Sequence, residues 1–450
     1  MEIINKFLSG TLVPFALLFY SVFFFIKLRG RPMINPPVIV RSVFKKKNKN
    51  GVSPIKAVIF ALAGTLGVGN IVGVASALAL GGAGAVFWMW VSACLAMILK
   101  YGEVVLAIKH RRIRNGENYG GAVYYMLDYF VLRKKRIVGI IYTFVFVALC
   151  LINGFTMGGI IQSNAIAQSF EASFKIKPIC TGILLALLSI IVFLFNAKRV
   201  FSLCEKLVPF VSVLYLCMSL AVIIKSYERI PSVLSEIFDG AFSLSAIGGG
   251  GLGFLISNAL RYGTIRGLFS NEAGCGTAPT AHATSNTDSP CEQGFLGMIE
   301  VFIDTIIVCT VTAFVILLNK EVAFTFSQNP MLMVYAAFSV SLGSASGVLL
   351  SVSVFLFAFA TIVCWGYYGR ECIYFVTNNN KNDKLFYVSY ISAVFVGSFI
   401  ALDTVWQLAD FAVGAMTLMN LFVLGKMHKE IKAATCSYFK KELPGGSSEN

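Results

Sequence analysis

Charged residues and histidines are scarce in this chain. Asp, Glu, Lys and Arg make up 13% of its 450 residues, and it has only three histidines. Hydrophobic residues make up 57%, and the mean hydropathy is +0.77. These values lie far outside the composition of soluble domains. The shortage of charge therefore excludes a soluble fold and predicts an all-α polytopic membrane protein.

Several functional patterns are also missing from the sequence. The 11 cysteines form no Cys-x-x-Cys pair, so we expect small buried hydrophobes rather than disulfides or a metal site. His110, His282 and His428 are far apart, and there is no phosphate-binding loop of the Walker type. We therefore expect neither an enzyme nor a nucleotide-driven pump, and no cofactor other than a co-transported ion.

Long apolar runs fill most of the remaining sequence. A helix needs about 20 apolar residues to cross a bilayer, and such runs predict about 11 transmembrane helices, at residues 11–28, 56–80, 84–108, 137–168, 180–196, 203–225, 241–269, 294–319, 346–377, 385–402 and 405–427. We divide the chain into an N-terminal helix with a basic linker, a ten-helix core and a C-terminal tail, at residues 1–52, 53–430 and 431–450. The core splits into halves at roughly 53–225 and 241–427.

The net charge of +15 is concentrated in the connections between apolar runs. Alternate connections are strongly basic, as expected for cytoplasmic loops, and we therefore expect a cell-membrane protein with its N-terminus outside and its C-terminus in the cytoplasm. On this assignment only a few of the 37 basic residues lie outside: Lys6, Lys175, Lys177, Lys225, Arg229 and Lys320. The pattern indicates contact with a lipid bilayer rather than with nucleic acid.

The first core span is interrupted by glycine and polar residues from Gly64 to Asn70. Gly248–Gly251 interrupt the first span of the second half in the same way. Paired broken helices in two inverted halves indicate a transporter and its midplane binding site. Close helix packing through small residues is the alternative interpretation of these glycines.

Unwound backbone at the first break offers N–H groups near Asn70 to a carboxylate and C=O groups near Ala63 and Leu66 to a cation. Elsewhere, Gln162 lies in an apolar span, and Thr361 and Trp365 share one helix face. Gln162 could bind substrate or join helices, and Trp365 could wall the pocket or belong to the core. The residues that we expect to bind substrate are Thr65, Gly67, Gly69, Asn70, Gln162, Gly250, Gly251, Asn258, Thr361 and Trp365. The residues expected at a sodium ion are Ala63, Leu66, Asn70 and Thr361.

A second polar cluster runs from Arg266 to Gly274. We expect it to form a gate or coupling loop on the inner side, after the second break, where Arg266 could pair with Glu272. Asp304 lies in the next span, where an acid is functional by default. The residues expected to act in gating or coupling are Arg266, Asn271, Glu272 and Asp304.

With these motifs, the chain resembles the alanine/glycine:cation symporters, also called sodium:alanine symporters, of the amino acid–polyamine–cation superfamily. The resemblance spans about Ser53 to Met427 and rests on several motifs in order: Gly67 to Ala75, Gly81 to Trp90 with Glu103, Gly120-Gly121 before Tyr124-Tyr125, Arg266 to Gly274 with Ala278-Pro279, Gln293-Gly294, and Phe302 to Thr305.

The resemblance implies a leucine-transporter-like fold, a 5+5 inverted repeat with one extra N-terminal helix. It also implies import of alanine or glycine with sodium, or in some members with protons, by alternating access. An uncoupled facilitator built from the same broken helices is the alternative. The sequence leaves open which amino acid and which ion are carried.

Overall fold

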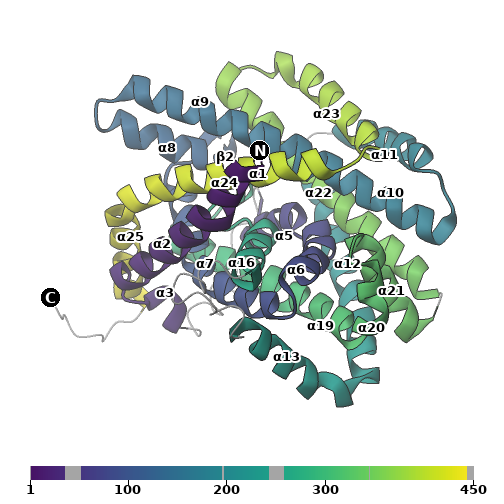
Figure 1. The fold of residues 1–450 in the computed structure, drawn as a ribbon. Coiled ribbons are helices and arrows are strands. Elements are labelled where there is room, and N and C mark those ends of the chain that lie inside the picture. Colours follow the sequence, from purple (N-terminus) through teal and green to yellow (C-terminus); the bar gives the residue numbers. More distant parts are fainter. Residues whose placement is uncertain (1, 36–51, 195–196, 243–257, 344, 443–450) are drawn as a thin grey trace.

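The fold follows from the length of the apolar runs, because in lipid a helix satisfies its own backbone hydrogen bonds. The computed structural model describes residues 2–35, 52–194, 197–242, 258–343 and 345–442, and these are almost entirely helical (Figure 1). Among them, seven segments are long and apolar enough to cross a membrane, or eight with one bent pair counted as a span: Ile3–Lys27, Gly84–Lys109, Arg136–Phe174, Val200–Lys225, Pro290–Leu318, Ala345–Thr377, Asp403–Lys426, and the pair Pro54–Thr65 with Val68–Gly81. Two further apolar helices are shorter, at Pro178–Phe193 and Pro330–Leu342.

The elements of the first half run in this order: α1 (Glu2–Phe7), η1 (Leu8–Leu12), α2 (Val13–Lys27), α3 (Arg31–Ile34), α5 (Pro54–Thr65), η2 (Val68–Asn70), α6 (Val72–Gly81), α7 (Gly84–Lys109), β1 (Arg112–Arg114), β2 (Glu117–Tyr119), α8 (Ala122–Val131), α9 (Arg136–Asn153), η3 (Gly154–Ile160), α10 (Ile161–Phe174), α11 (Pro178–Phe193) and α12 (Ala197–Lys225). The antiparallel hairpin β1–β2 is a small departure from the all-helical prediction. Segments α9, η3 and α10 form one long span, where the sequence predicts residues 137–168.

The second half continues with η4 (Tyr227–Arg229), α13 (Ile230–Phe242), α16 (Asn258–Asn271), α17 (Pro279–His282), α18 (Pro290–Val301), η5 (Phe302–Cys309), α19 (Thr310–Leu318), α20 (Lys320–Ala323), η6 (Phe324–Phe326), α21 (Pro330–Leu342), α22 (Ala345–Thr377), η7 (Asn380–Asn382), α23 (Asp383–Gly397), α24 (Asp403–Lys426) and α25 (His428–Glu442). The sequence predicts no span at α21, and the predicted break at Gly248–Gly251 lies outside the described residues.

The short helices α5, α6 and α16 lie in the middle of the molecule beside α7 (Figure 1). Helix α7 packs against α16 and α18, α16 packs against α6, and α22 packs against α5, α10 and α12. Two glycines let α16 approach α7 closely. A Cβ added to Gly263 would lie 2.4 Å from the carbonyl oxygen of Ala85, and one added to Gly267 would lie 2.7 Å from Ser92 Oγ. Small residues at such crossings bring backbones together in membranes and so hold the broken helices in the interior.

Helix α25 begins in the last residues of the predicted core and continues into the predicted tail, and it packs against α7. Glu430 accepts from Lys109 Nζ at 2.8 Å and lies 3.2 Å from His110 Nε2, while His110 Nδ1 lies 2.8 Å from Asp128 Oδ2. Burial disfavours the charged imidazole, but the hydrogen bonds to Asp128 and Glu430 outweigh it and raise the pKa of His110 to about 9. The hydrogen bond with His110 lowers the pKa of Glu430 to about 2. Opposite charges therefore fix α25 to the end of α7.

Candidate functional site

The first broken helix lies within the predicted span 56–80. Helix α5 ends at Thr65, and its axis is bent by 63° from that of the segment Val68–Gly81. Leu66 and Gly67 between them are not helical, and Gly67 N–H donates to Thr65 O at 2.8 Å. The sequence-based prediction of a break at the glycine run is confirmed. The break leaves the Ala63 and Leu66 carbonyls at the end of a half-helix, where the dipole favours a cation.

Side chains from two helices that are distant in the sequence form hydrogen bonds with the backbone of this break. Thr361 of α22 donates to the Ala63 carbonyl at 3.0 Å, and Gln162 of α10 accepts from Val68 N–H at 3.1 Å. Both meet at Gly67, where an added Cβ would lie 2.6 Å from Thr361 Oγ1 and 2.9 Å from Gln162 Oε1. Gly67 is therefore the point of closest approach, and the structure brings together five of the predicted site residues: Ala63, Leu66, Gly67, Gln162 and Thr361.

Asn70 links the first break to two other helices. Its Nδ2 donates to Ser270 Oγ at 2.9 Å and to Asp304 Oδ1 at 2.8 Å. Ser270 in turn donates to Asp304 Oδ2 at 2.5 Å, so its oxygen is left to accept from Asn70. This pattern orients the amide, because the opposite orientation would place an amide oxygen against the Asp304 carboxylate. Asn70 Oδ1 is buried, and no described residue donates to it.

Helix α16 ends at Asn271 and is followed by a turn at Glu272 to Gly276, which we call the second break. Glu272, Gly274 and Gly276 have φ values of +50°, +90° and +83°. A left-handed φ cannot continue a right-handed helix, and of these three residues only the two glycines adopt it without strain. Gly69 of the first break lies against the last turn of α16, with an added Cβ 3.6 Å from Phe269 Cδ1 and from Ser270 Cα. The two breaks are therefore neighbours in space.

This finding corrects the sequence-based placement of the polar cluster. Residues 266–271 are the last turns of helix α16 rather than an inner loop, and the turn after them is itself the break. Arg266 Nη1 is paired with Asp410 Oδ1 at 3.4 Å, so its predicted pairing with Glu272 is wrong. Glu272 Oε2 instead accepts a hydrogen bond from Thr277 Oγ1 at 2.5 Å.

Buried polar side chains that the sequence analysis assigned no role satisfy the peptide groups of the second break. Lys100 Nζ donates to the Asn271 carbonyl at 2.9 Å, and Glu103 Oε1 accepts from Gly276 N–H at 2.9 Å. Asn420 donates to the Gly274 carbonyl at 2.9 Å and to Glu103. Lys100 and Glu103 are both fully buried and one turn apart on α7. Their presence inside an apolar span is the signal that could have identified them.

A second layer of polar residues supports Lys100. Glu300 Oε1 lies 3.2 Å from Lys100 Nζ, and Glu300 Oε2 lies 2.7 Å from His282 Nε2. Gln293 Nε2 lies 2.9 Å from His282 Nδ1. All four side chains are buried. A buried charge is tolerated only when it is paired, so this chain of contacts holds the second break in one position.

The other predicted residues lie at different distances from the breaks. Thr65 is buried beside the first break, and Asn271 donates to Thr305 Oγ1 at 3.0 Å beside the second. Trp365 is fully buried and faces η3, where a Cβ added to Gly158 would lie 2.4 Å from the Trp365 Cβ. Asn258 is exposed at the start of α16, beside Gly81, so it lies apart from the group. Gly250 and Gly251 are outside the described residues.

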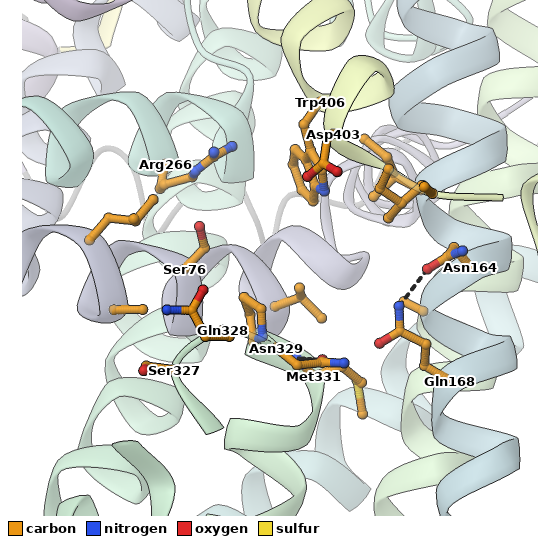
Figure 2. A pocket seen from close by; sticks show the side chains of 18 of the residues that line it. Ser76, Asn164, Gln168, Arg266, Ser327, Gln328, Asn329, Met331, Asp403 and Trp406 are labelled. Carbon is orange, nitrogen blue, oxygen red and sulfur yellow. Dashed lines mark hydrogen bonds between the residues drawn. The ribbon is translucent and has the colours of Figure 1, made fainter. Parts of the chain in front are cut away.

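A cavity of about 520 Å³ adjoins the first break. Val72 of α6, two residues past Asn70, and Ile161 of α10, next to Gln162, form part of its wall. Figure 2 shows Arg266 and Trp406 on one side of the cavity and Asn164 with Gln168 on the other. Its volume falls in the range of small-molecule sites.

Comparison with known proteins finds relatives that match almost the whole chain. The model of the sodium:alanine symporter family matches residues 1–449. An uncharacterized transporter of Haemophilus influenzae is 38% identical, over 88% of this chain and 86% of its own length. The sodium/alanine symporter AgcS of Methanococcus maripaludis is 34% identical, over 94% of this chain and 92% of its own. A manganese transporter of Eremococcus coleocola has a similar fold, with a TM-score of 0.54 at 13% identity over 87% of this chain and 78% of that one.

Proposed function

The chain belongs to the sodium:alanine symporter family, and from this premise we propose that it imports small neutral amino acids, alanine or glycine or both, together with sodium. In this proposal it is a secondary transporter with a leucine-transporter-like 5+5 inverted repeat, one added N-terminal helix and about 11 spans. Its N-terminus is outside and its C-terminus cytoplasmic. Transport proceeds by alternating access around a site between the two broken helices.

The observation that carries the proposal is the contact between two neighbouring breaks through Asn70, Ser270 and Asp304. Helix ends at a break carry partial charges, positive at the N–H end and negative at the C=O end, and these suit the carboxylate and the ammonium of an amino acid. In this proposal the substrate binds at the first break, next to Gly67 and Gly69, which have no side chains of their own. Gln162 and Thr361 define the opposite wall, with Trp365 behind them.

Sodium is a hard cation and prefers oxygen ligands. The Ala63 and Leu66 carbonyls, Thr361 Oγ1 and Asn70 Oδ1 are the oxygens that we propose for it. Asn70 Oδ1 supports the assignment, since it is buried and accepts no hydrogen bond within the described part of the chain, and such an oxygen is costly unless a cation or donor reaches it. A carboxylate of the bound substrate would complete the charge balance and couple the two solutes.

Proton coupling of the same transport is the second candidate. It is favoured by three buried acids, Glu103, Glu272 and Asp304. Glu103 Oε2 and Glu272 Oε1 have no hydrogen-bond partner among the described residues. A carboxyl group can carry a proton across the interior of a membrane protein, and Asp304 lies against both breaks. The experiment below separates the two ions.

The test is uptake of labelled alanine and glycine by proteoliposomes containing the purified protein. A sodium gradient should drive accumulation above the external concentration, and removal of that gradient should abolish it. If a proton gradient alone drives accumulation, the coupling ion is the proton and not sodium. Downhill flux without accumulation would refute symport and leave an uncoupled facilitator.

A further inference from the structure

The cavity beside the first break carries opposite charges that the transport site does not use. It is formed by α6, α10, α16 and the starts of α21 and α24, and it is partly open. We propose that it is a second, outer binding site for a zwitterionic amino acid, occupied in addition to the site between the breaks. The inference rests on the proposed transport function, because that function supplies the ligand.

Arg266 is the group that would bind the carboxylate. It is only 7% exposed, yet its ion pair with Asp410 is long, at 3.4 Å between Nη1 and Oδ1. Charge-assisted contacts of this kind are usually about 2.7–2.9 Å. Its Nε has no hydrogen-bond partner in the part of the chain that the structure describes. A buried guanidinium with an incomplete set of acceptors favours a further carboxylate, which its planar fork binds in a bidentate manner.

Asp403 adds a negative charge to the wall of the cavity that Arg266 also lines. The Arg266 guanidinium carbon lies 4.8 Å from the Trp406 ring centre, and Asp403 precedes Trp406 by three residues at the start of α24. Residues three apart lie on the same helix face, within one turn of about 5 Å. Figure 2 shows Asp403 beside Trp406. Asp403 is exposed, so it can receive an ammonium group while Arg266 holds the carboxylate.

The opposite wall consists mainly of neutral amides. Gln168 Nε2 donates to Asn164 Oδ1 at 2.6 Å (Figure 2). Gln168 Oε1 has no donor among the described residues. Gln328 and Asn329 face the same space. Amides accept and donate without charge, so this wall suits polar groups and water rather than one particular side chain.

The site should therefore recognise the charged ends of an amino acid and tolerate different side chains. A volume of about 520 Å³ is ample for a small amino acid with its water. The inner site is tighter, since Gly67 has no room for even one more methyl group. Selection by side-chain size would then occur at the breaks, after capture in the outer site.

The test is equilibrium dialysis of the purified full-length protein in sodium buffer with labelled alanine up to millimolar concentrations. The wild-type protein should bind two equivalents. Arg266→Gln should lose the second equivalent or weaken it about ten-fold or more, the usual effect of removing a hydrogen-bonded charge. Arg261→Gln is the matched control, because Arg261 lies on the same helix but lines a different cavity, beside α2. It should keep both equivalents.

Two further measurements check the site independently of the Arg266→Gln variant. Asp403→Asn changes an exposed residue and should fold, and it should weaken the second equivalent in the same direction. Alanine methyl ester has no carboxylate and should not displace that equivalent. A single equivalent in a wild-type protein with sodium-driven uptake would overturn the outer site and leave the proposed function intact. Two equivalents that survive both Arg266→Gln and Asp403→Asn would overturn it as well. Absence of sodium-driven uptake by the wild-type protein refutes the transport function itself.

Discussion

Replacement of Gly67 by alanine is the sharpest test of the first break. The added methyl carbon would lie 2.6 Å from Thr361 Oγ1 and 2.9 Å from Gln162 Oε1. Contacts shorter than 3 Å to a Cβ are not tolerated, so both side chains must move. Thr361 then loses its hydrogen bond to the Ala63 carbonyl, and Gln162 loses the one from Val68 N–H.

The size of the effect follows from these contacts. Overpacking of an interior by one methyl group costs about 1–3 kcal/mol, and each hydrogen bond contributes about 1 kcal/mol net. The lower end of the overpacking cost, added to the loss of two hydrogen bonds, gives a total free-energy cost of about 3 kcal/mol. Since 1.4 kcal/mol is a factor of ten, we expect sodium and alanine affinity to fall about 100-fold.

The assay is the initial rate of alanine uptake into proteoliposomes, measured against sodium and alanine concentration. Gly73→Ala is the matched control, because Gly73 lies in α6 just beyond the break and nothing lies within 4 Å of its added Cβ. It should transport as the wild type does. Unchanged affinities in Gly67→Ala, or an equal loss in Gly73→Ala, would refute the assignment of the site to this break.

Three further predictions concern other parts of the chain. Asn70→Ala should abolish sodium-dependent uptake without loss of expression, because it removes the donor to Asp304; normal uptake would exclude it from the site. Trp365→Ala should extend uptake to larger amino acids in competition assays, and an unchanged profile would make this residue part of the core only. The ion pair of His110 with Glu430 stabilises α25 most below about pH 6.5, the pKa of an unfolded histidine. This stabilisation should disappear as the pH rises through 9. Hydrogen exchange in α25 should therefore increase from pH 6.5 to 9.5 beyond the intrinsic pH effect, with no such excess in His110→Ala.

The parts of the fold that depend on local composition could be predicted from the sequence. Apolar length alone identified the long helices, and a polar interruption within such a run identified the first break. The position of Gln162 opposite Gly67 depends on the packing of α10 against a helix almost a hundred residues away. Its polarity in an apolar span was the only signal that the sequence contained.

The predicted break at Gly248–Gly251 lies outside the described residues, but the break after α16 shows that glycine content alone is an incomplete guide. The described break contains only two glycines, and it depends equally on Glu272 at φ +50° and on partners from other helices. Lys100, Glu103 and Asn420 satisfy its peptide groups. A break is stable where distant side chains replace the missing helical hydrogen bonds, and local sequence does not reveal which side chains those are.

The hydrogen bonds of Asn70 suggest how movement at the two breaks could be coupled. Its Nδ2 has two hydrogens, but four acceptors lie within reach: Ser270 Oγ, Asp304 Oδ1, Asp304 O and Cys309 Sγ. A displacement of the first break can therefore exchange one acceptor for another instead of breaking every bond. Ser270 would follow, because it donates a hydrogen bond to Asp304 Oδ2. A cation on Asn70 Oδ1 would strengthen the donors on the same amide, so occupancy of the proposed sodium site would fix the α16 break as well as its own.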